Sequence, residues 1–187
     1  HHGVFDLTYL RSIPGMTVLA PSNEAELRHM LATALTAAGP VAIRYPRGPG
    51  VGASTSTPPR VLPHGRGQVL RHGSGVSLLA VGSMVAPALQ AAELLAGEGI
   101  AATVADLRYV KPLDRELVLK LAAAGPLVTI EENVVTGGFG AAVVELLQDC
   151  GVTGVVVRRL GLPDAFVPHG STAALRAAAG LDAEGIA

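Results

Sequence analysis

Apolar residues in this chain follow two patterns that alternate along the sequence. Short, mostly apolar runs between turn-forming residues are typical of strands in a packed sheet. Stretches in which apolar residues recur every three or four positions predict amphipathic helices. The runs predict strands at 16–20, 41–44, 67–71, 76–81, 101–105, 127–130 and 154–158. The periodic stretches predict helices at 4–10, from Ser22 as N-cap through Leu35, at 84–97, at 112–123, from the Gly-rich 137–140 turn through Leu147, and up to about Ala179.

A change of composition separates the first strands from the rest. The stretch GPGVGASTSTPPRVLP at 48–63 is rich in Gly, Pro, Ser and Thr and has no period, which is typical of a linker. We therefore expect one folded segment at 1–48, a linker at 49–64 and a second folded segment at 65–187.

The regular order of strand and helix after the linker predicts an α/β fold. Such an alternation is typical of a mostly parallel sheet with helices on both faces. The strand at 67–71 differs, because only the short turn RHGSG joins it to the strand at 76–81. That connection is too short for a parallel crossover, so we expect these two strands to form an antiparallel pair at the edge of the sheet.

Composition excludes several classes of function. The formal net charge is -1, so no basic field indicates nucleic acid. No apolar run reaches the length of a membrane span, about 18 residues. Aromatic residues make up only 3% of the chain, and the core must therefore be built mainly from aliphatic residues. The single cysteine, Cys150, cannot form an internal disulfide, which fits a reducing cytoplasm, and its helical surroundings favour a buried, inert thiol.

Several polar residues at element ends have structural interpretations. Asp114 and either Ser171 or Thr172 are expected to cap helices. For the adjacent glutamates 131 and 132, a subunit contact or a helix cap is favoured over acid–base chemistry. The turn GGFG at 137–140 lacks the spacing of a dinucleotide fingerprint and favours tight strand-to-helix packing.

Two further residues give only weak functional signals. Lys111, at a strand-to-helix corner, is expected to face solvent or a partner domain. His169 lies in a loop without another Cys or His at the spacing of a metal site, so it indicates no metal.

The run Arg44-Tyr45-Pro46-Arg47-Gly48 is the clearest candidate for chemistry. It follows a predicted strand at its carboxyl end, where open α/β sheets place ligands. Two guanidinium groups three residues apart can hold a phosphate through paired charged hydrogen bonds. They can equally form structural salt bridges, and the residues alone leave both interpretations open.

The chain begins with His1 and His2 and continues directly into an apolar pattern. A tag remnant or a solvated terminus explains two such histidines. If part of the protein precedes this sequence, His1 instead belongs to a motif, and its imidazole could carry a proton or donate a hydrogen bond.

Five segments together resemble one family over essentially the whole chain. They are HHGVFDLTYLRSIPGMTVLAPSNEAEL, GPVAIRYPRG, LRYVKPLD, EENVVTGGFG and GLPDAFVPHG. Their order and spacing are similar to those of 1-deoxy-D-xylulose-5-phosphate synthases. The resemblance implies that residues 1–48 end a pyrimidine-binding α/β domain and that residues 65–187 form a transketolase-type C-terminal domain.

The resemblance also implies a reaction. In this family, pyruvate and D-glyceraldehyde 3-phosphate condense on thiamine diphosphate, with Mg2+, and CO2 is lost. The product, 1-deoxy-D-xylulose 5-phosphate, is used for isoprenoid, thiamine and pyridoxal phosphate synthesis. His1 matches a substrate-contacting histidine and is the candidate for proton handling. Arg47 matches the arginine that binds the acceptor phosphate, Arg44 has a supporting role, and no role is assigned to His2.

Segments that the family needs for its cofactor have no match in this sequence. These are the diphosphate- and Mg2+-binding loop and the glutamate that activates the cofactor, so no cofactor- or metal-binding residue is expected here. We therefore expect a chain that is inactive alone and that works with the N-terminal portion of the enzyme, as a separate chain, in a cytoplasmic homodimer. Two alternatives remain: another transketolase-like enzyme or 2-oxo acid dehydrogenase β subunit, and a non-catalytic dimerisation module.

Overall fold

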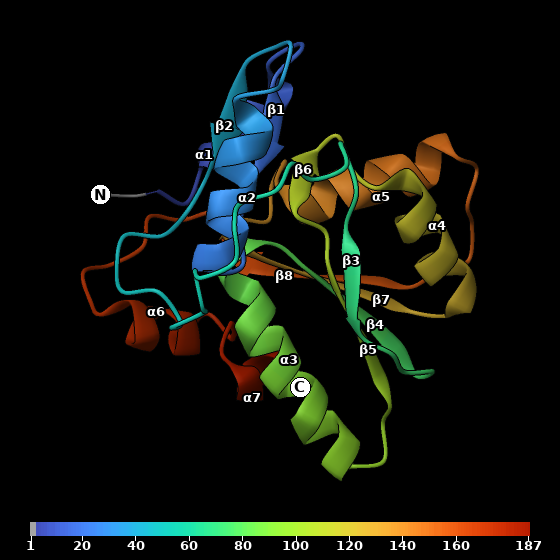
Figure 1. Cartoon of the computed structure of the whole chain (residues 1–187). Coiled ribbons are helices and arrows are strands. Elements are labelled where there is room, and N and C mark those ends of the chain that lie inside the picture. The colour runs from blue at the N-terminus through green and yellow to red at the C-terminus, as the bar shows by residue number, and fades with distance from the viewer. Residues whose placement is uncertain (1–2) are drawn as a thin grey trace.

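The structure is a computed structural model that describes residues 3–187, so that His1 and His2 lie outside the described part. It contains a small upper part and a larger lower part (Figure 1). The small part is formed by α1 (Asp6–Ser12), β1 (Thr17–Leu19), α2 (Glu24–Ala34) and β2 (Val41–Ile43). The larger part is formed by β3 (Gln68–Arg71), β4 (Val76–Ala80), the 3-10 helix η1 (Gly82–Met84), α3 (Val85–Gly97), β5 (Ala102–Asp106), β6 (Tyr109–Lys111), α4 (Arg115–Ala124), β7 (Leu127–Val134), α5 (Phe139–Asp149), β8 (Val157–Leu162), α6 (Thr172–Ala178) and α7 (Ala183–Ile186).

The larger part confirms the predicted mostly parallel sheet with one antiparallel edge strand. Its strand order is β3-β5-β4-β7-β8, and only the β3–β5 pair is antiparallel. Successive residues of β4 point to opposite faces: Leu78 packs into an apolar cluster with α3 and α7, whereas Leu79 packs into a second cluster with α4 and α5. The aliphatic core therefore lies on both faces of this sheet, as the sequence pattern predicts.

The predicted pairing of strand 67–71 with strand 76–81 is wrong, because β5 lies between them. The connecting turn crosses the start of β5. The amides of Ser74 and Gly75 both donate to the carbonyl of Ala101, at 2.9 and 2.8 Å. A Cβ at Gly73 would lie 2.4 Å from that carbonyl oxygen, so glycine allows the close crossing. A short connection excludes a parallel crossover, but here it does not join neighbouring strands.

Several local details also differ from the sequence prediction. Asn23, not Ser22, caps α2, and its side chain accepts from the amide of Glu26 at 2.9 Å. Asp114 and Ser171 are helix caps, as predicted. Cys150 is only half-buried and lies after α5, so the prediction of a buried thiol within a helix is wrong. The strand β6 and the helix α7 lie in segments for which the sequence predicts no helix or strand.

The strand β6 joins the two parts of the molecule. It pairs antiparallel with β1 and completes a three-stranded sheet of order β2-β1-β6. Just before it, Arg108 adopts a left-handed backbone conformation with φ of 56°, and its amide donates to Asp106 at 2.9 Å. The Arg108 guanidinium donates to both carboxylate oxygens of Glu26, at 2.7 and 2.8 Å, in a buried salt bridge. Lys111 donates to the carbonyls of Arg11 and Ile13, so it contacts the small part.

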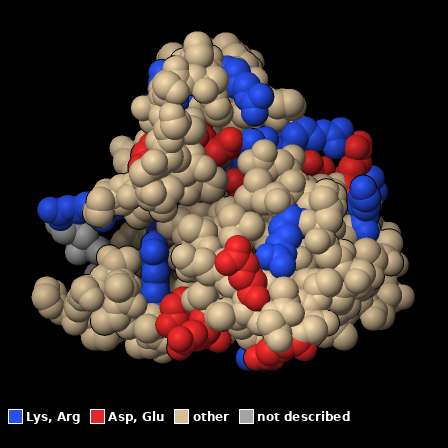
Figure 2. All heavy atoms as spheres, turned by 60° about the horizontal axis from the view of Figure 1, so that its bottom comes forward, with Lys and Arg blue, Asp and Glu red and all other residues tan. Residues whose placement is uncertain are grey.

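Charge on the surface lies in small groups. Figure 2 shows a face of the molecule on which small groups of basic and acidic residues lie within a mostly uncharged surface. None of the helices in the described part of the chain is long and apolar enough to cross a membrane.

A buried carboxylate determines where α5 begins. Glu131 lies within β7, has no exposed surface, and accepts from the amides of Phe139 and Gly140 at 2.7 and 2.8 Å. This is the helix-capping role expected for one of the two glutamates. The tight packing predicted for the GGFG turn is also confirmed, since a Cβ at Gly140 would lie 2.4 Å from the Thr129 hydroxyl.

Burial raises the pKa of Glu131 to about 7, although the two amides act in the opposite direction. In the unfolded chain Glu131 loses its proton near the ordinary pKa of 4.5. In the folded protein it keeps this proton up to a higher pH. The associated stability is present below the ordinary pKa and is lost as the pH rises through about 7.

We expect Glu131→Gln to remove this pH dependence. Between pH 4.5 and 7.5 the wild-type protein should lose stability relative to the variant by roughly 3 kcal/mol. Urea unfolding at several pH values measures the difference. Glu98→Gln, at an exposed site, is the matched control and should follow the wild-type protein. A constant difference between wild type and Glu131→Gln across the range would contradict the interpretation.

Candidate functional site

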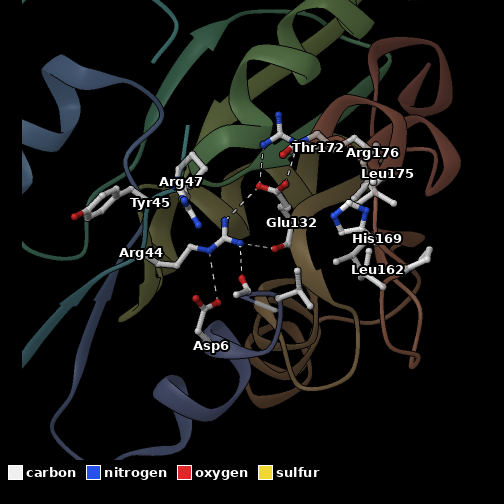
Figure 3. Close-up of a pocket in the computed structure, with 17 residues that line it drawn as sticks. Asp6, Arg44, Tyr45, Arg47, Glu132, Leu162, His169, Thr172, Leu175 and Arg176 are labelled. Carbon is white, nitrogen blue, oxygen red and sulfur yellow. Dashed lines mark hydrogen bonds and ion pairs between the residues drawn. The ribbon is translucent and has the colours of Figure 1, made fainter. Parts of the chain in front are cut away.

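A cavity lies where the two parts of the molecule meet. Its volume is about 490 Å³, and its walls come from the start of the chain, from the segment after β2, from β7 and from the region between β8 and α7. Figure 3 shows that Arg44, Tyr45 and Arg47 lie on one side and His169, Leu175 and Arg176 on the other, with Glu132 between them. Its wall therefore joins sequence segments that lie more than a hundred positions apart, and it includes Gly3, Val4, Asp6, Arg44, Tyr45, Pro46, Arg47, Glu132, Leu162, Val167, Pro168, His169, Gly170, Thr172, Leu175, Arg176 and Leu181.

Arg44, directly after β2, binds protein groups with most of its donors. Its Nη2 donates to the carbonyls of Gly3 and Glu132 at 2.7 and 2.9 Å. Its Nε lies 3.5 Å from the carboxylate of Asp6, and its Nη1 lies 3.5 Å from that of Glu132. The side chain is 11% exposed. For Arg44, this geometry is that of a structural salt bridge, which is one of the two interpretations that the sequence alone leaves open.

Glu132 is the centre of a charged cluster in the cavity wall. Arg176 donates to both of its carboxylate oxygens at 2.9 and 2.8 Å, and the Ser83 hydroxyl donates to Oε2 at 2.7 Å. Burial acts to raise the pKa of Glu132, but the hydrogen bonds of Arg176 and Ser83 and the charges of Arg176 and Arg44 lower it below its ordinary value. Glu132 is therefore ionised at neutral pH and neutralises positive charge in the cavity.

Arg47 differs from Arg44 although both belong to the same short motif. It is exposed, lines the cavity, and has neither an ion pair nor a hydrogen bond within residues 3–187. Three guanidinium groups and two carboxylates line the cavity, and both carboxylates contact arginines other than Arg47. The excess positive charge therefore belongs to Arg47, which leaves its planar set of donors available for an anion.

His169 also lines this cavity, on the side opposite Arg47 (Figure 3). It is exposed and precedes the Ser171 cap of α6. Sequence reasoning considered it only as a metal ligand and so missed its place in the cavity wall. It also missed Arg176 and the role of Glu132, because spacing along the chain does not show that β7 and α6 meet the segment after β2.

The predicted site residues are only partly brought together in the described chain. Arg44 and Arg47 line one cavity, whereas His1 lies outside the described residues. The roles of His1, Arg44 and Arg47 toward a substrate stay predictions. A group of three or more residues able to hold a metal ion was not found among the described side chains.

The fold and the site define a class of protein: an α/β chain in which a small part packs against a larger part with a mostly parallel sheet, with a cationic cavity between them. The model of the transketolase C-terminal domain matches residues 65–186, and that of the transketolase pyrimidine-binding domain matches residues 1–50. The chain belongs to the transketolase family.

Curated relatives narrow this similarity. The chain is 58% identical to 1-deoxy-D-xylulose-5-phosphate synthase 2 of Geobacter sulfurreducens and 56% identical to 1-deoxy-D-xylulose-5-phosphate synthase of Thermomicrobium roseum. Both alignments include 100% of this chain and 30% of the relative. The chain thus spans about a third of the length of the curated relatives it matches, and its resemblance to the synthase family is confirmed.

Solved structures show the same fold. A split-gene transketolase, described as an inactive beta4 tetramer, superposes with a TM-score of 0.85 at 37% identity and covers 97% of this chain and 58% of that chain. A transketolase from Pichia stipitis superposes with a TM-score of 0.71 at 18% identity, over 100% of this chain and 26% of that one. The second likeness concerns the fold alone.

Proposed function

We propose that this chain is the C-terminal portion of a 1-deoxy-D-xylulose-5-phosphate synthase. The complete enzyme condenses pyruvate with D-glyceraldehyde 3-phosphate, releases CO2, and forms 1-deoxy-D-xylulose 5-phosphate for isoprenoid, thiamine and pyridoxal phosphate synthesis. The observation that carries the proposal is the identity of 58% over the whole chain to a named synthase. With its single cysteine the chain also suits the reducing cytoplasm.

Thiamine diphosphate and Mg2+ belong to this proposal, but the described residues do not form their site. Asp6 and Glu132, the carboxylates that line the cavity, are paired with arginines. The cofactor supplies the carbanion chemistry of the reaction when it is bound, and we assign its binding to the N-terminal portion of the enzyme. What this chain contributes is recognition of the acceptor.

Arg47 carries that contribution in the proposal. A phosphate dianion in a partly dry cleft needs a cation with directed donors, and a guanidinium supplies two parallel N–H groups. Arg47 is the guanidinium of the cavity whose donors are not used within residues 3–187. Arg44 supports it indirectly, by holding the wall of the cavity. His1, by its match to the family, handles a proton.

The surface of the small part supports assembly with the N-terminal portion of the enzyme. The strand β2 is an edge of its sheet and pairs in parallel with β1. Parallel sheets normally have both faces covered, and unpaired edges are normally protected. Leu31 and Leu35 of the neighbouring α2 segment are 51% and 89% exposed. We propose that the N-terminal portion, as a separate chain, covers this region and that the complete enzyme is a homodimer.

A chimera tests the proposed function. The part of the Geobacter sulfurreducens synthase 2 that precedes the matched region is fused to this chain and supplied with thiamine diphosphate and Mg2+. We expect product from pyruvate and D-glyceraldehyde 3-phosphate, and none from this chain alone. A chimera that folds and binds the cofactor but makes no product would refute the assignment.

In the same chimera, Arg47→Ala should weaken recognition of the acceptor. Loss of one charged hydrogen-bonded contact costs about 1.5–3 kcal/mol, so the KM for D-glyceraldehyde 3-phosphate should rise roughly ten- to a hundredfold. Pyruvate has no phosphate, and its KM should change far less. Steady-state kinetics measures both, and Arg60→Ala, outside the cavity, is the matched control. An unchanged acceptor KM with a raised pyruvate KM would show that Arg47 does not bind the phosphate.

A further inference from the structure

The charged cluster around Glu132 connects α6 with the first residues of the described chain. Arg176 comes from the end of α6, Ser83 from η1 and Arg44 from the segment after β2, and all three meet the Glu132 side chain. Glu132 itself is 13% exposed. A change at Arg176 can therefore reach Arg44 through a single side chain.

The distances show how Glu132 is shared between the two arginines. Arg176 occupies both carboxylate oxygens at 2.9 and 2.8 Å, whereas Arg44 approaches Oε2 only to 3.5 Å. Because Arg176 already satisfies Glu132, the shorter hydrogen bonds of Arg44 go to backbone carbonyls. One of these, at 2.7 Å, is the carbonyl of Gly3.

Arg44 thereby holds the start of the described chain at two points. In addition to Gly3, it lies 3.5 Å from the carboxylate of Asp6, the first residue of α1. The carbonyl of Val4, between these two points, accepts from the amide of Val134 at 2.9 Å, whereas Leu7 of α1 is buried in the core. Loss of the Arg44 contacts would therefore loosen residues 3–6 without detaching α1.

We propose that Arg176 is a positioning residue for the N-terminal loop. It neutralises Glu132, and this leaves Arg44 to hold Gly3 and Asp6. Without Arg176, the Glu132 carboxylate draws the Arg44 guanidinium toward itself and away from Gly3. Gly3 follows His1 by two residues in the sequence, so we expect a change at Arg176 to affect turnover, a consequence that rests on the proposed function.

The first test does not involve activity. Hydrogen exchange is measured on this chain for wild type, Arg176→Met, Arg176→Lys and the exposed control Arg158→Met. Met keeps much of the apolar stem of Arg176, and Lys keeps the charge but not the paired geometry. The reporter is the Val134 amide, which donates to the carbonyl of Val4. Its exchange should rise on the order of tenfold in Arg176→Met, as expected for loss of one charged hydrogen bond, and less in Arg176→Lys.

Strand β4 and the Arg158→Met control should exchange as in the wild-type protein. Unchanged exchange at Val134 in both Arg176 variants would overturn the proposal. So would an equal rise throughout the chain in both variants, because that result indicates general destabilisation. The Lys variant keeps the test decisive if Arg176→Met fails to fold.

The second test uses the chimera. Arg176→Lys should lower kcat several-fold and leave the KM for D-glyceraldehyde 3-phosphate nearly unchanged, the reverse of the pattern expected for Arg47→Ala. A raised acceptor KM with constant kcat would overturn the proposal, since Arg176 would then bind the phosphate directly. If the wild-type chimera makes no product, the proposed function fails, and the hydrogen exchange still decides the role of Arg176.

Discussion

The contact between the small part and the larger part, called the joint below, depends on the buried salt bridge between Arg108 and Glu26. Its side chains are 7% and 9% exposed, and both charges have left water to form two short hydrogen bonds. A buried charge without its partner costs several kcal/mol, about 3–5 in typical cases. Either residue without the other would therefore destabilise the fold. The pair forms only while the small part is packed against the larger part.

The apolar residues of the small part are buried together with residues of the larger part. Leu7 and Val18 are fully buried in a cluster that also contains residues of β4, α4 and α5. Its two parallel strands gain a third only because β6 pairs with β1. Since the cavity wall is composed of segments from both parts, its geometry exists only while the joint is closed. Arg44 and Arg47 both line the cavity, but Arg44 is held by backbone carbonyls and carboxylates, whereas the donors of Arg47 are not used within residues 3–187.

Local patterns along the sequence predicted most of the elements and several caps. Asp114, Ser171 and Glu131 act where local rules place them, because a cap is decided by residues close to it in space and mostly in sequence. The partner of β3 could not be predicted, since the glycine-containing turn passes over another strand. The strand β6 is too short to show a period. The resemblance to known synthases predicts a phosphate contact for Arg47, which stays a prediction, whereas contacts between β7, α6 and the segment after β2 appear only in the folded chain.

Both parts of the chain are expected to fold as one unit, because the Arg108–Glu26 salt bridge and the shared core join them. Differential scanning calorimetry of the wild-type chain, over a pH range in which unfolding is reversible, tests it directly. We expect one heat-absorption peak whose calorimetric and van't Hoff enthalpies agree, as in a two-state transition. Two separate peaks, or a calorimetric enthalpy well above the van't Hoff value, would show that the small part unfolds independently of the larger part.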